Sequence, residues 1–345
     1  MRARCPMLSD LPAPMLNTKG WPWDEENTRL SDTMIDGRPW PRISIVTPSY
    51  NQGKFLEETI RSVILQRYAN LEYIIIDGGS TDNSVKILKK YEPWVSYWVS
   101  ESDRGQSHAI NKGLMQATGD FVAYQNSDDI YWPQALRKVG EILSCGEIDL
   151  LFGTADALDE YGNRRLPICR LPEPHIDVLI RFWKGPSNIL PSQGFFCRLE
   201  LLKKIGLFNE KYHYKMDLDV ICRLLEIVPR QRIACIDDSL AGYRIYETSK
   251  TGNMSSNMAV EEGIEISSRY WEQVSRGTPE KIAREARRGK GFMAFCRAGI
   301  AAEKGNLGTT LKELIRAYVN YPRLGITHSN LSILKRICLP NWMGG

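Results

Sequence analysis

Two adjacent carboxylates follow a short apolar run in the middle of the chain. Asn126-Ser127-Asp128-Asp129 comes directly after the run from Phe121 to Tyr124, so the acids lie where a buried strand reaches solvent. Adjacent carboxylates there repel each other and lose hydration unless a cation or backbone amides compensate them. Such oxygen donors favour Mg²⁺ or Mn²⁺, and an ion with few protein ligands keeps coordination sites for substrate phosphates. The simpler alternative is that Ser127 or Asp129 caps a helix starting near Pro133.

A second acidic pair stands in Met216-Asp217-Leu218-Asp219, at the start of an amphipathic helix. Acids in a first turn favourably meet the helix dipole, which explains most such pairs. A carboxylate at a helix start beside a pocket is also how a general base is presented to a substrate. Three further side chains have suitable chemistry: Gln193 for a sugar hydroxyl, and Arg244 and Lys250, on a loop after a strand, for a diphosphate.

Strands and helices alternate in the segment that must position these residues. We expect strands at 43–47, 73–76, 97–99 and 121–124, and helices between them at 55–66, 82–91 and 107–117. Strands that are apolar on both faces and alternate with helices indicate an α/β fold with a mainly parallel, doubly wound sheet. Ligands of such sheets bind outside the carboxyl ends of the strands. Polar loops follow all four strands, at 47–51, 77–82, 101–106 and 126–129, which predicts one shared crevice.

The alternation loosens after about residue 150. We expect strands near 150–152, 195–196, 233–236 and 240–245, a helix at 217–226 and an irregular segment at 159–174. Helical composition follows, with helices expected at 259–274, 279–303 and 307–319. The chain therefore divides into an extended N-terminal arm (1–41) that packs its tryptophans on the body, an α/β domain (42–255) and a helical C-terminal extension (256–345).

Composition indicates a globular protein. The chain has 345 residues, of which 43% are hydrophobic and 25% charged, as is usual for soluble domains. The eight cysteines are scattered without a C-x-x-C pair, so we expect reduced core residues of a cytosolic protein. Residues 1–14 are interrupted by prolines and Asp10, unlike an export signal. No stretch approaches the roughly 20 apolar residues of a spanning helix, so we expect a cytoplasmic protein, at most peripheral on the inner face of the membrane.

Positive charge is concentrated near the C-terminus, although the net charge is only +4. Between residues 276 and 336, bases clearly outnumber acids. Solvated helix faces explain this most simply, and contact with anionic lipid headgroups is the alternative. We expect no nucleic-acid partner, because the segment has no recognisable binding module.

The loop Asp77-Gly78-Gly79-Ser80-Thr81-Asp82 has two interpretations. It is a strand-to-helix turn in which glycines supply positive φ, or Asp77 accepts a hydrogen bond from a nucleobase while the glycines let the ligand approach. The sequence lacks a P-loop and a G-x-G-x-x-G after the first strand, which argues against Walker-type ATP hydrolysis and classical dinucleotide binding. Tyr50 follows a strand end and could stack on a base. Arg104 offers a cation near the crevice, and we assign no chemistry to His108.

Four motifs together resemble a known family, the inverting GT-A fold glycosyltransferases of family 2. The segments 45–51, 76–82, 103–106 and 126–129 occur in the order and spacing of that family, and the resemblance runs from about Ile43 to Lys250. It implies a nucleotide-diphosphate sugar donor and an ion, Mg²⁺ or Mn²⁺, on the diphosphate, with Asp129 as its principal protein ligand. The implied nucleotide-binding residues are Thr47, Pro48, Tyr50, Asp77, Arg104 and Asp128.

The resemblance also implies a catalytic base. Asp217 matches the family's acidic position that takes the proton from an acceptor hydroxyl, and Asp219 matches the second acid of that motif. The acceptor would be a saccharide or a lipid-linked glycan, in the synthesis of cell-surface polysaccharide. One departure is Tyr246, which stands where many relatives have His, two residues after Arg244. Because a phenol is a poor ligand for Mg²⁺ or Mn²⁺, we assign Tyr246 no metal role.

Two other functions remain open from the sequence. A non-catalytic nucleotide-sugar-binding subunit of a synthesis complex has no need for the complete set of Asp77, Asp128, Asp129 and Asp217, which argues against it. A nucleotidyltransferase shares the sheet and the metal, but usually carries a Gly-rich loop with a basic residue after the first strand. This chain has the run 48–51, Pro-Ser-Tyr-Asn, at that place.

Overall fold

The structure is a computed structural model that describes residues 5–14, 18–167, 192–250, 257–274 and 280–322. The chain divides into two compact units. The first comprises Met1–Pro174 and Leu190–Gly252, and the second comprises His175–Ile189 and Asn253–Gly345.

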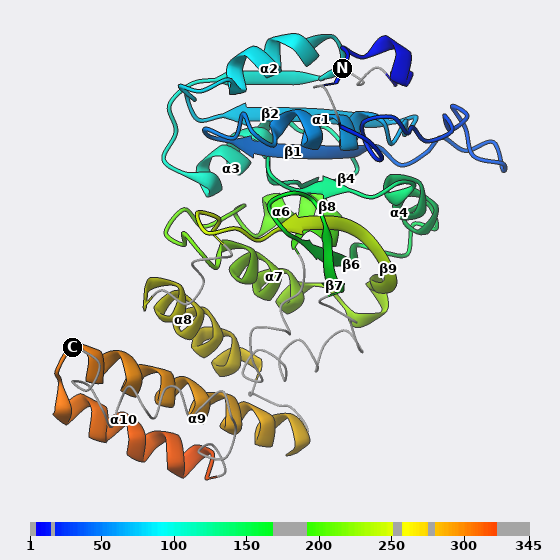
Figure 1. The fold of residues 1–345 in the computed structure, drawn as a ribbon. Helices are drawn as coiled ribbons and strands as arrows, with labels where there is room; N and C mark the ends of the chain where they lie inside the picture. The colour runs from blue at the N-terminus through cyan, green and yellow to red at the C-terminus, as the bar shows by residue number, and fades with distance from the viewer. Residues whose placement is uncertain (1–4, 15–17, 168–191, 251–256, 275–279, 323–345) are drawn as a thin grey trace. The chain divides into compact units, whose positions relative to one another are not determined.

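The first unit is built on one mixed sheet of nine strands within the described residues (Figure 1). Its first half is parallel, as the sequence predicts, and the structure gives it the order β3-β2-β1-β4. These strands are β1 (Ile43–Ser49), β2 (Leu71–Asp77), β3 (Tyr97–Ser100) and β4 (Phe121–Tyr124). Every residue of β1 and β2 is buried, because helices cover both faces of this half.

Different helices cover the two faces. On one face, α1 (Leu56–Ile64) and α2 (Ser84–Tyr91) share a hydrophobic core with Ile43, Ile45 and Ile75. On the other face lies α3 (Gln106–Gln116), which contacts β1 and β2. A Cβ at Gly113 would lie 2.4 Å from Val46, so glycine lets α3 approach the sheet closely.

The parallel strands end level with one another. Ser49 pairs with Asp77, and Asp77 pairs with Ser100, across β1, β2 and β3. The loops that follow these strands therefore leave the sheet at one edge, as the sequence predicts, and this edge carries the candidate site.

The second half of the sheet is largely antiparallel. It contains β5 (Ile130–Tyr131), β6 (Leu150–Leu158), β7 (Arg164–Pro167), β8 (Phe195–Arg198) and β9 (Ile233–Arg244), of which β6 and β9 pair in parallel. The helices of this half are α4 (Ala135–Leu143), α6 (Leu199–Lys204) and α7 (Met216–Ile227). The sequence analysis does not predict β5 or α6, which have two and six residues.

Two expectations for this half are wrong in detail. The segment 159–174 was expected to be irregular, but β7 lies within it, and residues 168–174 are outside the described part of the chain. A turn closes this hairpin because Asp159 Oδ1 accepts the backbone N–H groups of Tyr161 and Asn163. The two strands expected at 233–236 and 240–245 are one strand, β9. Its two exposed acids at 237–238 are residue types common in turns, which is why the sequence pattern indicates a break there.

A fully buried arginine fastens the N-terminal arm to the first unit. Arg61 of α1 donates to the carbonyl oxygens of Pro22 (3.0 Å), Pro12 (3.1 Å) and Trp23 (3.1 Å), and to the Tyr91 hydroxyl (3.0 Å). Its guanidinium also lies over the Trp23 ring. The arm thus packs its tryptophans on the body, as expected, and it adds core residues Leu11, Leu30 and Trp40.

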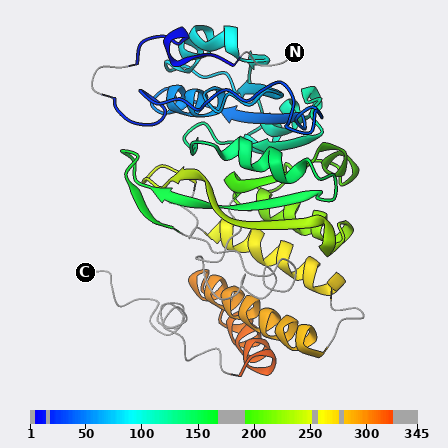
Figure 2. The ribbon, with the colours of Figure 1, turned by 90° about the vertical axis from the view of Figure 1, so that its right-hand side faces the viewer.

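The second unit contains the helices α8 (Asn257–Val274), α9 (Glu280–Glu303) and α10 (Leu307–Asn320), close to the predicted bounds. Helices α9 and α10 lie side by side in both views (Figures 1 and 2) and pack through Ala294, Phe295 and Ala317. Within the described residues, none of the helices combines the length and the apolar character needed to cross a membrane.

None of the six described cysteines forms a disulfide bond, as expected for reduced residues, but they are not all core residues. Cys197 and Cys222 are buried, whereas Cys145 is exposed and the other three are half-buried. Cys145 follows the end of α4 in a polar turn, where its small side chain reaches solvent. Cys169 and Cys338 lie outside the described residues.

Candidate active site

A pocket of about 490 Å³ opens at the edge of the sheet where the strand-end loops meet. All four predicted loops contribute to it, together with the segment that follows β9. Its lining includes Pro48, Ser49, Tyr50, Gln52, Gly78, Asp103, Gly105, Gln106, Asn126, Ser127, Asp128, Asp129, His213, Arg244, Tyr246, Thr248, Ser249 and Lys250.

Asp129 lies at the buried end of this pocket and is almost fully enclosed. Its Oδ1 accepts the backbone N–H of Arg244 at 2.9 Å, and its Oδ2 accepts the side-chain amides of Asn126 and Gln193, both at 2.9 Å. Gln193 is absent from the pocket lining. Its contact with Asp129 gives it a positioning role in place of the predicted contact with a sugar. The helix-cap alternative is wrong, because α4 begins without a side-chain cap.

The two adjacent carboxylates form a site that suits a divalent cation. Burial, followed by the negative charge of Asp128, raises the pKa of Asp129 to about 7. Burial likewise raises the pKa of Asp128, against the opposing hydrogen bond from Tyr246. A hard cation would relieve this mutual repulsion and accept the carboxylate oxygens as ligands. The described residues contain no cluster of three acidic, His or Cys side chains, so such an ion would also need phosphate oxygens or water.

Arg244 and Tyr246 join the end of β9 to these acids. The Tyr246 hydroxyl donates to Asp128 Oδ2 at 2.9 Å. Arg244 is 2% exposed at its side chain, pairs with Glu58 at 2.6 Å and donates to the Asp128 carbonyl oxygen. Its buried Nε has no hydrogen-bond partner among the described residues.

The predicted nucleotide-binding residues fall into two groups. Pro48, Tyr50 and Asp128 line the pocket, and the Tyr50 ring is 61% exposed. Thr47 is buried and its hydroxyl lies 3.2 Å from the Tyr73 hydroxyl, away from the lining. Asp77 is also fully buried, and its carboxylate accepts hydrogen bonds from the Ser80 N–H and from the hydroxyls of Ser80 and Ser100, which compensate its lost hydration. Direct base contact through Asp77 requires this network to open.

The loop between β3 and α3 contributes residues to the pocket, but the predicted residue Arg104 is not one of them. Arg104 is exposed and pairs with Glu210 at 2.8 Å, outside the pocket lining. Its neighbours Asp103 and Gln106 line the pocket instead. A Cβ at Gly78 would lie 2.7 Å from Asp103 Oδ2 and 3.3 Å from the Tyr50 ring. Glycine at position 78 therefore makes room for both side chains.

Asp217 lies in the first turn of α7, outside the pocket lining. Its Oδ1 accepts the backbone N–H of Leu218 at 2.8 Å. Burial raises the pKa of Asp217, while the positive charges of Lys215 and Lys250 oppose that rise. Lys250 lines the pocket and donates to the His213 carbonyl oxygen at 3.0 Å.

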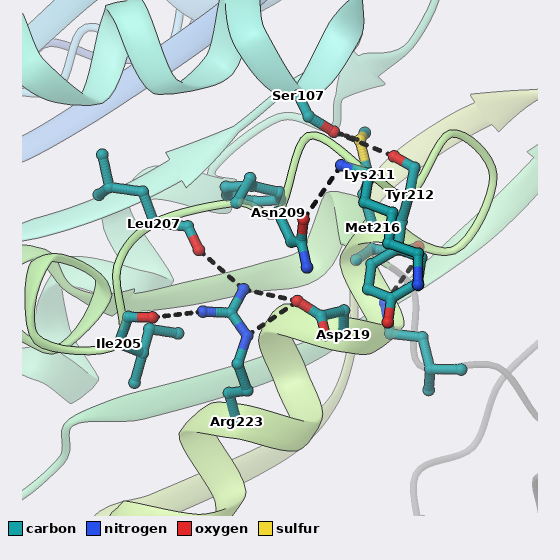
Figure 3. Close-up of polar contacts among 12 residues, drawn as sticks. Ser107, Ile205, Leu207, Asn209, Lys211, Tyr212, Met216, Asp219 and Arg223 are labelled. Carbon is teal, nitrogen blue, oxygen red and sulfur yellow. Dashed lines mark hydrogen bonds and ion pairs between the residues drawn. The ribbon is translucent and has the colours of Figure 1, made fainter. Parts of the chain in front are cut away.

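Asp219 has structural contacts in place of the predicted substrate contact. It is fully buried and pairs with Arg223 at 2.6 Å. Figure 3 shows Arg223 between Asp219 and the carbonyl oxygens of Ile205 and Leu207, to which it donates at 2.6 and 2.7 Å. This network joins α7 to the segment after α6, so Asp219 helps to position the start of α7. We withdraw it from the substrate-binding residues.

Several pocket residues are not predicted from the sequence. Ser49 ends β1 and has a buried hydroxyl with no partner among the described residues. Asp103 and Gln106 belong to a motif that the sequence analysis used only for Arg104, while Thr248 and Ser249 lie between two residues that it did select. His213 and Gln52 carry no sequence signal that separates them from ordinary loop residues.

Comparison with known proteins identifies the family. Residues 44–206 match the family described as "Glycosyl transferase family 2". An uncharacterized glycosyltransferase of Mycobacterium tuberculosis is 31% identical over 199 residues, which cover 57% of this chain and 73% of that protein. An uncharacterized glycosyltransferase of Nostoc sp. is 26% identical over 248 residues, covering 66% of this chain and 74% of that protein.

Solved structures agree on the fold. TarS 1–349 of S. aureus in complex with UDP-GlcNAc has a TM-score of 0.56 at 16% identity, covering 82% of this chain and 91% of that chain. Mannosyltransferase PcManGT from Pyrobaculum calidifontis, in complex with GDP-Man and Mn²⁺, has a TM-score of 0.53 at 17% identity, covering 89% and 92%. The fold is therefore that of a GT-A glycosyltransferase. The chain belongs to glycosyl transferase family 2 and is a glycosyltransferase.

Proposed function

We propose that this protein transfers a sugar from a nucleotide-diphosphate sugar to an acceptor hydroxyl with inversion of configuration. The observation that carries this proposal is the pocket that joins an exposed aromatic residue, Tyr50, to two adjacent carboxylates, the half-buried Asp128 and the buried Asp129. An aromatic face suits a nucleobase, and the carboxylates suit a cation on a diphosphate. TarS with UDP-GlcNAc and PcManGT with GDP-Man, which share the fold, support this donor class.

The donor would lie along the pocket with each group facing complementary residues. Tyr50 and Pro48 contact the base, with Asp77 behind them, and Asp128 contacts the ribose. Asp129 holds Mg²⁺ or Mn²⁺, which when bound supplies Lewis-acid stabilisation of the diphosphate charge. Lys250 and Arg244, which both line the pocket, add positive charge beside the phosphates.

Asp217 is the proposed base. It takes the proton from the acceptor hydroxyl, whose oxygen attacks the anomeric carbon from the face opposite the diphosphate. The new C–O bond forms as the bond to the nucleoside diphosphate breaks, so the configuration inverts without a covalent enzyme intermediate. Burial favours this role because a base with a raised pKa accepts a proton more readily.

The proposed setting is the synthesis of cell-surface polysaccharide or of a lipid-linked glycan, on the cytoplasmic side of the membrane. The acceptor would then be a saccharide or a lipid-linked sugar. The competing function is a nucleotide-sugar-binding subunit without activity, which would need the pocket but not Asp217.

A thermal-stability measurement tests the donor class. The purified protein is heated with UDP-, GDP- and dTDP-sugars, with and without Mn²⁺, beside the Asp129→Ala variant. We predict a metal-dependent rise in Tm with one nucleotide class, lost in the variant. No rise with any donor, in a protein shown to be folded, contradicts the proposal.

A further inference from the structure

An unusual apolar stripe lies on the outer face of α10 in the second unit. Five large apolar side chains on this helix are between 47% and 78% exposed. Their spacing of about four residues places them on one side of an α-helix, over about 18 Å at 1.5 Å per residue. The stripe consists of Leu307, Leu311, Ile315, Tyr318 and Val319.

The opposite side of α10 already has a partner. Ala317 packs against Ala294 and Phe295 of α9, with Leu314 at the edge of this small core. The stripe is therefore a second apolar face on the same helix and is not needed for the contact with α9.

The charges around the stripe have one sign. Lys312 and Arg316 are exposed along one flank of the stripe. The single acid of α10, Glu313, is buried and accepts from Arg297 at 2.8 Å and from Arg316 at 2.6 Å. The solvent side of α10 thus presents apolar and basic groups and no exposed acid. This charge pattern complements an anionic surface.

We propose that the outer face of α10 docks on an anionic lipid bilayer, with the stripe entering the headgroup region. A helix with an apolar face flanked by bases, and with an aromatic hydroxyl such as that of Tyr318 at its edge, is suited to lie in the interface. A bilayer satisfies both features of this face together, because its headgroups take the bases and its acyl region takes the stripe. This inference does not depend on the transferase reaction.

Vesicle flotation of the full-length protein tests the docking surface. The vesicles contain phosphatidylcholine alone or an equal mixture with phosphatidylglycerol. The test variant carries Leu311→Ser, Ile315→Ser and Val319→Ser, all at exposed positions. The matched control carries Ile35→Ser, Met115→Ser and Tyr161→Ser, which are exposed apolar residues of the first unit. Circular dichroism verifies that both variants are folded.

We expect the wild type and the control to bind the mixed vesicles, with weaker binding at high salt. The stripe variant should bind at least about tenfold more weakly, because apolar area no longer enters the interface. No binding by the wild type, or equal binding by the stripe variant, overturns the proposal. Light scattering provides the other decisive outcome: a dimer that the stripe variant converts to a monomer, without vesicle binding, assigns this face to a second copy of the chain.

Discussion

Replacement of Arg61 by methionine should strongly destabilise the first unit. Methionine keeps much of the buried stem but removes every donor of the guanidinium. Three arm carbonyl oxygens and the Tyr91 hydroxyl then lose their hydrogen bonds to this residue. The contact between the cation and the Trp23 ring is lost as well.

The expected magnitude follows from the burial of these bonds. Two of them, to the Pro22 carbonyl and to Tyr91, are fully buried. The Pro22 oxygen loses this donor, and an orphaned buried group costs about 1–3 kcal/mol, whereas the Tyr91 hydroxyl keeps its hydrogen bond to Glu57 at 2.8 Å and costs less. The other two are partly buried and cost less, while removal of a desolvated charge returns part of the total. We therefore predict a loss of about 3 kcal/mol in the free energy of unfolding.

Urea denaturation of the two matched variants measures this effect. Arg137→Met is the control, because Arg137 forms an exposed pair with Glu141 within α4, and such pairs contribute at most about 0.5 kcal/mol. Limited proteolysis should also release the arm faster in Arg61→Met than in the control. If both variants lose the same small stability and resist proteolysis equally, the proposed anchoring role of Arg61 is refuted.

Two further predictions concern the pocket and the pH dependence of stability. Gly78→Ala should weaken donor binding by about tenfold, because the new Cβ displaces Asp103 or the Tyr50 ring; unchanged binding in calorimetry contradicts this packing. For Asp149, burial raises the pKa but hydrogen bonds from Arg232 and Arg198 outweigh it, so the folded-state pKa is lowered. The resulting stability is present above the unfolded-state pKa and is lost as pH falls below about 4. Urea denaturation at decreasing pH should show a smaller loss in Asp149→Asn, and an identical loss contradicts the assignment.

The parallel half of the fold was predictable because its signals are local. Apolar runs such as Tyr73–Ile76 form strands buried on both faces, and each ends in a polar loop. Strand order and register then bring those loops to one edge. For the same reason Asp128 and Asp129 could be placed in the pocket from sequence.

Side-chain directions and long-range partners were not predictable in this way. Because β1 is buried on both faces, its pattern does not show that Thr47 points to Tyr73 and away from the pocket. Arg104 lies outside the pocket because it pairs with Glu210, which is 106 residues further along the chain. Similarly, Asp219 and Arg223 are only four residues apart in the sequence. The role of their ion pair depends on the carbonyl oxygens of the segment after α6, to which Arg223 donates (Figure 3).

The most direct test of the central claim is the turnover of Asp217→Asn, measured as release of nucleoside diphosphate from the donor identified by thermal stabilisation. Asparagine has nearly the same shape but cannot accept the proton, and Glu226→Gln, at an exposed position on the same helix, is the control. We predict that kcat falls by at least about a hundredfold, the usual contribution of a general base, while donor binding and the control are unchanged. Near wild-type turnover in Asp217→Asn, with normal donor binding, would contradict the assignment of Asp217 as the base.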